Sequence, residues 1–321
     1  MKKLLFVGIR YHGYTKAMID EFERQGYAVT FYDIEPWSTS RKVLHSLLPA
    51  IYLRSRNSRH RTILARECSQ LYDLVFFLQA HQFSPENLQQ LRLAQPRARF
   101  VLYNWDSVGS LVNRGGDYRP LLPYFDRAYT FDRADAAELK IGYLPLFCVR
   151  EFQGRIADEK AANCVYFVGN LENVRRYRAV HAFWHYCRQH DIPFSVYLAC
   201  RPRMYLRLLA AGILPRGVRF GSVSQQEFLQ MLDGAASVFD FANHDQAGFT
   251  MRVMENLCAG KKIITNNKSI KKEAFYTSER IFVFESLDFS EVDNFIKRPV
   301  ASPDASLADY YIQNFVHKLL D

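Results

Sequence analysis

Residues 237–265 read SVFDFANHDQAGFTMRVMENLCAGKKIIT. The apolar run at 237–242 predicts a strand, the amphipathic run at 250–258 predicts a helix, and the apolar run at 262–265 predicts a second strand. Gly260 follows the helix, where a glycine in the left-handed conformation commonly ends a helix. The stretch therefore predicts one strand–loop–helix–strand unit of a parallel α/β sheet.

The same alternation of strands and helices fills both halves of the chain. The first half has strand-like runs at 3–9, 27–34, 73–79, 98–105 and 127–131, and a helical run at 14–25 that ends at Gly26. The second half adds strand-like runs at 164–169, 194–199 and 218–220, and helical runs at 175–190, 203–211 and 225–232. The pattern predicts the α/β class, with two Rossmann-like doubly wound parallel-sheet domains facing one cleft.

The break between the halves lies near residues 143–158, where an apolar LPL sequence leads into a polar stretch. We predict an N-terminal domain at 1–150, a C-terminal domain at 151–305, and an amphipathic C-terminal helix in 306–321 that returns to the first domain. A length of 321 residues suits two such domains better than one.

Composition excludes several classes of protein. With 49% hydrophobic and 23% charged residues the chain is an ordinary globular one. Its apolar start stops at Arg10, too early for an export signal, and no run is long enough to span a membrane. The six cysteines lack metal-site spacing, so we expect reduced, buried thiols in a cytoplasmic protein.

The turn at 248–250 has the chemistry of a phosphate-binding turn. Gly248 permits close approach of the backbone, and Thr250 is a suitable cap for the helix that follows. The free amides of the first helical turn would then bind an anion such as a diphosphate. Glu255 lies about one turn further along, where a carboxylate can accept hydrogen bonds from two ribose hydroxyls.

This stretch resembles the donor-site motif of GT-B glycosyltransferases, in which a Gly-Phe-Gly-like turn stands seven residues before an E-A-M-A-x-G-x-P-V-I segment. Residues 255–264, ENLCAGKKII, align with that segment. The wider stretch 241–267 is similar to small bacterial glycosyltransferases of lipopolysaccharide and capsule assembly. The resemblance implies that Gly248, Phe249 and Thr250 hold the donor phosphates and that Glu255 holds the ribose.

The sequence departs from the family at one position. Many members carry a glutamate eight residues before the second one, and this chain has Ala247 there. Gln246, Asp245 and His244 are alternative candidates for a direct contact with the sugar.

A second donor-side element is the sequence FVGN at 167–170. It ends a predicted strand, and in GT-B enzymes the loop after this strand faces the donor diphosphate. Without a metal ion, arginines and helix amides must stabilise the leaving diphosphate. The candidates are Gly169, Asn170, Arg175, Arg178 and Arg252. For any single arginine the alternative is a solvated helix face.

In GT-B enzymes the first domain binds the acceptor and commonly supplies a catalytic base. Asp106 ends a predicted strand beside Trp105, which can stack on a sugar, and a carboxylate there can deprotonate an acceptor hydroxyl. His81 and His12 follow two other predicted strands and are the next candidates. Asp132 has a similar position, although it is equally suited to capping the next helix.

The excess positive charge lies in the first half. Residues 1–150 carry 21 Lys and Arg against 14 Asp and Glu, whereas residues 151–321 carry 21 against 19. Residues 41–66 contribute seven basic residues and no acidic ones, interleaved with leucines. We expect this segment to lie on an anionic membrane surface. A plain solvated face and a nucleic-acid patch are the alternatives, and no nucleic-acid motif accompanies the segment, so we expect no nucleic-acid partner.

The sequence as a whole predicts a cytoplasmic, peripherally membrane-bound glycosyltransferase. It would transfer a hexosyl or related group from a nucleotide-sugar donor to a glycan or lipid-linked glycan acceptor. We expect no metal site and no cofactor, because no Asp-x-Asp pair follows an apolar strand in a donor position. The rival hypotheses are a nucleotide-sugar epimerase on the same scaffold and a non-catalytic nucleotide- or glycan-binding protein.

Overall fold

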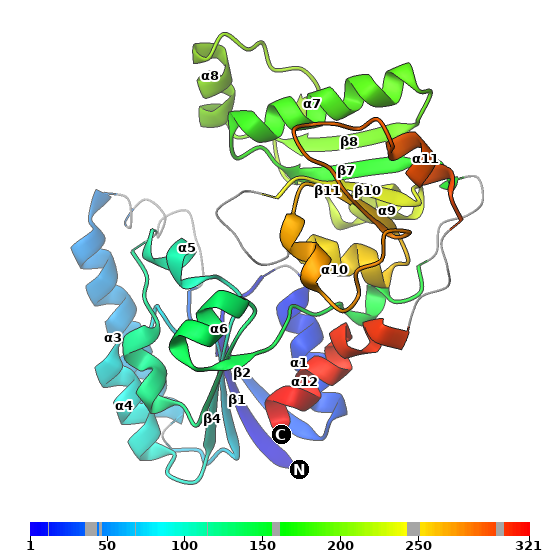
Figure 1. The fold of residues 1–321 in the computed structure, drawn as a ribbon. Helices are drawn as coiled ribbons and strands as arrows, with labels where there is room; N and C mark the ends of the chain where they lie inside the picture. The colour runs from blue at the N-terminus through cyan, green and yellow to red at the C-terminus, as the bar shows by residue number, and fades with distance from the viewer. Residues whose placement is uncertain are drawn as a thin grey trace. The chain divides into compact units, whose positions relative to one another are not determined.

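The structure, a computed structural model, describes residues 1–11, 13–35, 44, 47–67, 69–113, 115–155, 161–242, 251–299 and 305–321. The chain forms two compact units, each with its own parallel sheet (Figure 1). Unit 1 comprises Met1–Leu146 and Ile312–Asp321, and unit 2 comprises Phe147–Tyr311. The predicted α/β class and the two doubly wound parallel sheets are therefore confirmed.

Unit 1 is built on a six-stranded sheet of order β2-β1-β3-β4-β5-β6, and all of its strand pairs are parallel. The strands are β1 (Lys2–Gly8), β2 (Tyr27–Asp33), β3 (Leu74–Leu78), β4 (Arg99–Asn104), β5 (Arg127–Thr130) and β6 (Gly142–Tyr143). Every side chain of β3 is buried, because helices cover both faces of a parallel sheet. The edge strand β2 is only partly buried, as expected for a strand with one neighbour.

The helices of unit 1 begin and end at residues suited to these positions. They are α1 (Tyr14–Arg24), α3 (Pro49–Glu67), α4 (Pro85–Ala94), α5 (Val108–Val112), η1 (Arg119–Tyr124), α6 (Arg133–Leu139) and the C-terminal α12 (Ile312–Leu320). Ser84 caps α4 by accepting a hydrogen bond from the amide of Asn87, and Pro85 occupies its first turn. Gly26, with φ of 90°, follows α1 in a conformation that glycine adopts without strain.

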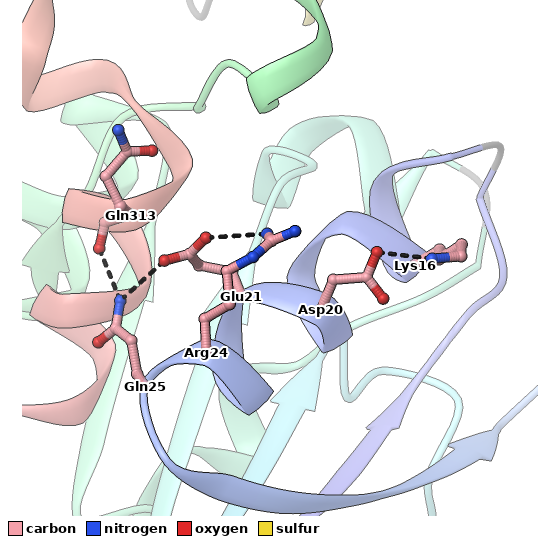
Figure 2. Close-up of polar contacts among 6 residues, drawn as sticks. All are labelled: Lys16, Asp20, Glu21, Arg24, Gln25 and Gln313. Atoms are coloured by element: carbon pink, nitrogen blue, oxygen red, sulfur yellow. Dashed lines mark hydrogen bonds and ion pairs between the residues drawn. The ribbon is translucent and has the colours of Figure 1, made fainter.

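The C-terminal helix α12 belongs to unit 1, although almost the whole of unit 2 precedes it in the chain. The Gln25 side chain donates a 3.0 Å hydrogen bond to the Gln313 carbonyl of α12, and it also lies 3.4 Å from the Glu21 carboxylate (Figure 2). The Phe315 ring packs edge-on against Tyr103 of β4 at 4.8 Å. The prediction that the C-terminal helix returns to the first domain is thus confirmed.

Unit 2 repeats the plan with a sheet of order β12-β11-β10-β7-β8-β9, again parallel throughout. The strands are β7 (Val165–Asn170), β8 (Phe194–Ala199), β9 (Val218–Arg219), β10 (Ser237–Asp240), β11 (Lys262–Thr265) and β12 (Ile281–Val283). The helices are η2 (Arg150–Phe152), α7 (Val174–Gln189), α8 (Pro202–Ala210), α9 (Gln225–Asp233), α10 (Met251–Cys258), η4 (Lys268–Lys272), α11 (Val292–Lys297) and η5 (Ala305–Tyr310).

Stacked aromatic rings form the centre of the unit 2 core. Phe239 of β10 stacks on Phe183 of α7 at 4.2 Å and on Phe284 at 5.5 Å. The Phe289 ring meets the Phe183 ring edge-on at 5.1 Å. These large side chains fix α7 against the middle of the sheet and therefore fix the loop between β7 and α7.

Candidate functional site

Each sheet contains one point at which the strand order reverses. In unit 2, β8 and β9 lie on one side of β7, and β10, β11 and β12 lie on the other. In unit 1 the same reversal falls between β1 and β3. The carboxyl ends of the two strands beside such a point form the usual ligand-binding crevice of an open α/β sheet. The two switch points are therefore the places to look for a site.

Arg176 joins the two strand ends at the unit 2 switch point. Its guanidinium donates one hydrogen bond to the Asn170 carbonyl at the end of β7 (2.8 Å) and one to the Phe241 carbonyl just after β10 (2.9 Å). Asn173 caps α7 by accepting a hydrogen bond from the Arg176 amide. The arrangement fixes a positive charge at the base of the crevice, beside the amino end of α7.

The predicted arginines Arg175 and Arg178 lie on the exposed side of α7, and the structure brings neither into this network of strand ends. Gly169 is close-packed: a Cβ atom there would lie 2.9 Å from the Phe167 ring. Asn170 is exposed and contributes its carbonyl oxygen to Arg176. The sequence prediction chose Arg175 and Arg178 of this helix and not the inward-facing Arg176, because helix periodicity at the amino end does not show which side faces the strand ends.

Helix α10 is fastened to β7 through two polar side chains. Arg252 donates a hydrogen bond to the Val168 carbonyl, and its guanidinium lies 5.1 Å from the centre of the Phe228 ring. Asn256 accepts a 2.8 Å hydrogen bond from the Tyr166 hydroxyl. Arg252 therefore positions the helix that carries Glu255, and its charge also lies near the end of β10.

Asp240, the last residue of β10, is a buried carboxyl group that sequence reasoning missed. It accepts a 2.8 Å hydrogen bond from the Thr265 hydroxyl at the end of β11. Burial raises the pKa of Asp240, while Thr265 and the charges of Arg176 and Arg252 act in the opposite direction. The sequence signal that could have identified Asp240 is an aspartate within the apolar run 237–242, just before the stretch that resembles the donor-site motif.

Glu255 is the second buried carboxyl group of the site. Its side chain belongs to a residue only 5% exposed, and no described residue donates a hydrogen bond to it. Burial raises the pKa of Glu255 to about 8, so the group is largely protonated at neutral pH. A buried carboxyl group whose pKa is raised this far is typical of a binding or catalytic site.

The turn residues Gly248, Phe249 and Thr250 lie outside the described residues, as do His244, Asp245, Gln246 and Ala247. The start of their loop is held firmly. The Asn266 side chain accepts a 2.7 Å hydrogen bond from the Ala242 amide and donates one of 3.2 Å to the Ala242 carbonyl. This pair of bonds ties the chain after β10 to the chain after β11.

The unit 1 switch point has a different lining. A Cβ atom on Gly8 would lie 2.9 Å from Leu78 Cβ, so only glycine allows β1 and β3 to end this close together. Gln79 follows β3 with φ of 64°, an uncommon conformation for a residue with a side chain. Its amide group donates a 2.6 Å hydrogen bond to the carboxylate of Asp106, the first candidate base.

Aromatic rings accompany this carboxylate. The Trp105 ring meets the exposed Tyr11 ring edge-on at 5.5 Å. Asp106 is half-buried, and the residue that caps α5 is Ser107 rather than Asp106. Tyr11 was not among the candidates, although its place directly after the first predicted strand was a usable signal.

The remaining unit 1 candidates differ in their surroundings. The His81 ring lies against Gly116, where a Cβ atom would come within 2.8 Å of it. His12 lies outside the described residues. Asp132 caps α6 by accepting hydrogen bonds from the amides of Ala134 and Asp135 (2.8 and 3.2 Å), which is the alternative role considered for it.

The basic segment 41–66 is described in part, chiefly as α3. Leu47, Leu48, Ile51 and Leu53 are exposed, and so are Arg54, Arg61 and Arg66. Arg56 and Arg59 instead face their own unit: Arg59 donates a 2.6 Å hydrogen bond to the Asp33 carbonyl, and Arg56 lies 4.0 Å from the Glu35 carboxylate. The exposed surface is thus a set of apolar side chains with three arginines.

Within the described ranges no group of three or more His, Cys, Asp or Glu side chains is placed to hold a metal ion. None of the helices described here is long and apolar enough to cross a membrane. The described cysteines are free thiols, and only Cys164 among them is not fully buried.

Comparisons with known proteins find similarity in structure but not in sequence. No protein-family model matches the chain, and no curated protein matches it. An α-glucosyltransferase in complex with UDP and a 13-mer DNA containing a central A:G mismatch is similar with a TM-score of 0.64 and 11% identity, over 100% of this chain and 95% of that one.

A UDP-forming α,α-trehalose-phosphate synthase from Burkholderia xenovorans, in complex with glucose-6-phosphate, is similar with a TM-score of 0.63 and 13% identity, over 99% of this chain and 100% of that one. The UDP-GlcNAc 2-epimerase of Methanocaldococcus jannaschii has a TM-score of 0.51 at 11% identity, over 100% and 99% of the two chains. At these identities the similarity shows the fold, and the fold is GT-B.

Proposed function

We propose that this protein is a glycosyltransferase that takes a hexosyl or related group from a nucleotide-sugar bound to unit 2. The observation that carries the proposal is Glu255, a buried carboxyl group without a described hydrogen-bond donor, one turn inside the helix that follows the switch-point loop. Two ribose hydroxyls would satisfy this group, and a nucleoside diphosphate presents them next to an anion.

The diphosphate would lie against the positive charge of Arg176 and the amino end of α7. Arg175 is the nearest exposed arginine on that helix and would complete the contact, with Arg178 one turn further away. The loop residues Gly248, Phe249 and Thr250 would supply backbone amides, and Gly169 and Asn170 would line the opposite strand end. Positive charge and amides at this position stabilise the leaving diphosphate without a metal ion.

The acceptor hydroxyl would be deprotonated by Asp106. Its carboxylate accepts a hydrogen bond from the Gln79 amide, which orients the group, and a carboxylate so placed can take the proton of an acceptor hydroxyl. Trp105 and the exposed Tyr11 offer aromatic faces on which a sugar ring can stack. His81 and His12 remain the alternative bases.

We propose further that the acceptor is a growing surface glycan linked to a lipid, and that the protein is a cytoplasmic one bound to the inner face of the membrane. The exposed leucines and arginines of α3 support this location, because such a surface binds anionic lipid. Replacement of Arg54 and Arg61 by glutamate should weaken binding to anionic vesicles, whereas replacement of Arg56 and Arg59 would disturb their contacts with β2 and the Glu35 region. Unchanged vesicle binding of the Arg54/Arg61 variant would refute the role of α3.

A transfer assay tests the proposed function. The protein is incubated in EDTA with labelled UDP-, GDP-, ADP-, CMP- and TDP-sugars and a lipid-linked oligosaccharide extract, and the label is followed into the lipid fraction. Label in the lipid supports the proposal. Isomerised donor without acceptor would identify an epimerase instead, and donor binding without turnover would identify a binding protein. A parallel reaction contains DNA in place of the lipid extract, and label in the DNA would show that the acceptor is not a lipid-linked glycan.

A further inference from the structure

Helix α8 of unit 2 carries an apolar surface that none of the roles above uses. The helix connects β8 to the edge strand β9 in the chain, and Figure 1 shows it at the margin of unit 2. Its inner face is buried through Met204 and Leu208. On its outer face Leu206 is 65% exposed and Leu209 is 42% exposed, so burial in the core accounts for neither leucine.

The chain after β9 adds a third exposed apolar side chain. Phe220 is 61% exposed, and its ring lies 5.6 Å from that of Tyr205 on α8. Pro202, Tyr205, Leu206 and Phe220 together line a hollow that is open to solvent. We call Leu206, Leu209 and Phe220, with the neighbouring Arg203 and Arg207, the α8 surface.

The neighbouring helix α9 shows what an ordinary solvent face looks like in the same unit. It has the same length, and its exposed positions are Gln225, Gln226, Gln230 and Asp233. Both helices bury one side on the same sheet, yet only α8 presents leucines outward. Leu206 and Phe220 line one hollow, and Leu209 lies one turn along the helix from Leu206, so these side chains form a group, and grouped exposed apolar side chains point to a contact with something else.

The charges around these side chains have one sign. Residues 192–226 contain five arginines and no aspartate or glutamate. Arg219 forms an ion pair with Glu227 at 2.5 Å, but no described carboxylate lies within ion-pair distance of Arg203 or Arg207. Both arginines are exposed: Arg207 directly follows Leu206 in the sequence, and Arg203 precedes Leu206 by three residues, about one helical turn.

We propose that the α8 surface docks on an anionic lipid bilayer. Leucine and phenylalanine side chains would enter the boundary between headgroups and acyl chains, and Arg203 and Arg207 would pair with lipid phosphates. A helix of nine residues buries little area, so this contact is reversible and depends on anionic lipid. The contact rests on the membrane location given in the proposed function and extends it to unit 2. The binding of the α8 surface to lipid requires neither a bound donor nor α3.

Vesicle binding of the full-length chain tests the proposal. The probes are vesicles of phosphatidylcholine alone and of phosphatidylcholine with an equal part of phosphatidylglycerol. The wild-type protein should bind only the second kind. The variant Leu206→Ser/Leu209→Ser/Phe220→Ser should show an apparent partition coefficient lower by at least about fivefold, since three inserted apolar side chains are lost.

Two further variants complete the experiment. Leu71→Ser/Leu93→Ser removes two leucines that are 69% and 73% exposed elsewhere on the molecule, and it should bind vesicles as the wild type does. Arg203→Glu/Arg207→Glu keeps every apolar side chain and should also bind the anionic vesicles more weakly than the wild type does. A Phe220→Trp variant should show a blue-shifted emission that brominated lipid quenches, which reports insertion directly.

The proposal is overturned if the serine variant binds vesicles as the wild type does, or if Phe220→Trp is not quenched. It is also overturned if the serine variant converts a wild-type dimer to a monomer, since the surface would then join two copies of this chain. Nucleotide binding of the same variants keeps the two proposals apart. Normal nucleotide affinity with lost vesicle binding supports the α8 contact, and vesicle binding without any nucleotide affinity refutes only the proposed function.

Discussion

The switch points of the two units share a topology but differ in chemistry. Both lie beside the first strand of their unit, and near each of them a side-chain amide connects the ends of two neighbouring strands. Gln79 after β3 bonds to Asp106 after β4 in unit 1, and Asn266 after β11 bonds to Ala242 after β10 in unit 2. Unit 2 then adds Arg176, Arg252 and two buried carboxyl groups. Unit 1 adds the aromatic rings of Tyr11 and Trp105 and one half-buried carboxylate.

This difference separates two kinds of ligand. Fixed positive charge beside a helix amino end favours a polyanion, and a protonated carboxyl group favours hydroxyls that can donate to and accept from it. Aromatic faces with one carboxylate suit an uncharged sugar whose hydroxyl must lose a proton. One scaffold, used twice, therefore supports the proposed division into a donor side and an acceptor side.

The greatest loss of activity should come from a change at Asp106 in unit 1. Asp106→Asn should lower kcat for glycosyl transfer by about 10²–10⁴-fold, because the amide cannot accept the proton of the acceptor hydroxyl. Nucleotide affinity, which we assign to unit 2, should stay unchanged in calorimetry. Asp132→Asn is the matched control: asparagine caps a helix about as well as aspartate does, so both the stability and kcat should stay close to those of the wild type. Equal kcat values for wild type and Asp106→Asn would remove Asp106 as the base.

The second effect concerns the pH dependence of stability in unit 2. The pKa of Glu255 is about 8 in the folded protein and 4.5 in the ordinary case, so the folded state keeps a proton that the unfolded chain releases between these values. The stabilising contribution is complete below about pH 4.5 and is lost as the pH rises to about 8. The free energy of unfolding should fall by roughly 3–5 kcal/mol across this range at most.

Urea unfolding at several pH values measures this fall. Glu255→Gln should flatten the curve relative to the wild type, while the slope caused by Asp240, whose pKa burial also raises, should remain in both proteins. Superimposable pH profiles of the two proteins would show that the Glu255 carboxyl group is not held neutral.

The three arginines at the start of α7 should differ in their effects on nucleotide binding and on stability. Arg175→Ala should weaken nucleoside diphosphate binding by about 1–3 kcal/mol without changing the thermal midpoint, since the side chain is exposed. Arg176→Ala should lower both the nucleotide affinity and the thermal midpoint, because it also removes the hydrogen bonds to the ends of β7 and β10. Arg178→Ala should have the smallest effect. If all three variants bind nucleotide as the wild type does, the diphosphate does not bind beside α7.

The last prediction concerns the two hydrogen bonds between the Asn266 side chain and the Ala242 backbone in unit 2. Asn266→Ala removes two hydrogen bonds to Ala242 and should cost about 1–2 kcal/mol of stability, together with a modest loss of nucleotide affinity. Asn267→Ala removes only the cap of η4 and should cost stability alone. If Asn267→Ala loses more nucleotide affinity than Asn266→Ala does, the bonds from Asn266 to Ala242 do not position the nucleotide site.

Local patterns predicted the order and class of the elements well. Apolar runs such as 237–242, and glycines such as Gly26 and Gly260, correspond to the observed β10 and to helix ends with positive φ. The inward turn of Arg176 and the burial of Asp240 depend on how α7 and β11 pack, which no local pattern contains. The same holds for the left-handed Gln79 that positions Asp106, since glutamine alone gives no sign of a positive φ.

The proposed function depends above all on whether unit 2 binds a nucleoside diphosphate through Glu255. Calorimetric titration of the full-length protein with UDP, GDP, ADP, CMP and TDP, each in EDTA, tests it directly. We expect saturable binding of one diphosphate, weakened by about 1–3 kcal/mol in Glu255→Ala. No binding of any nucleotide, or equal affinity in Glu255→Ala, would contradict it.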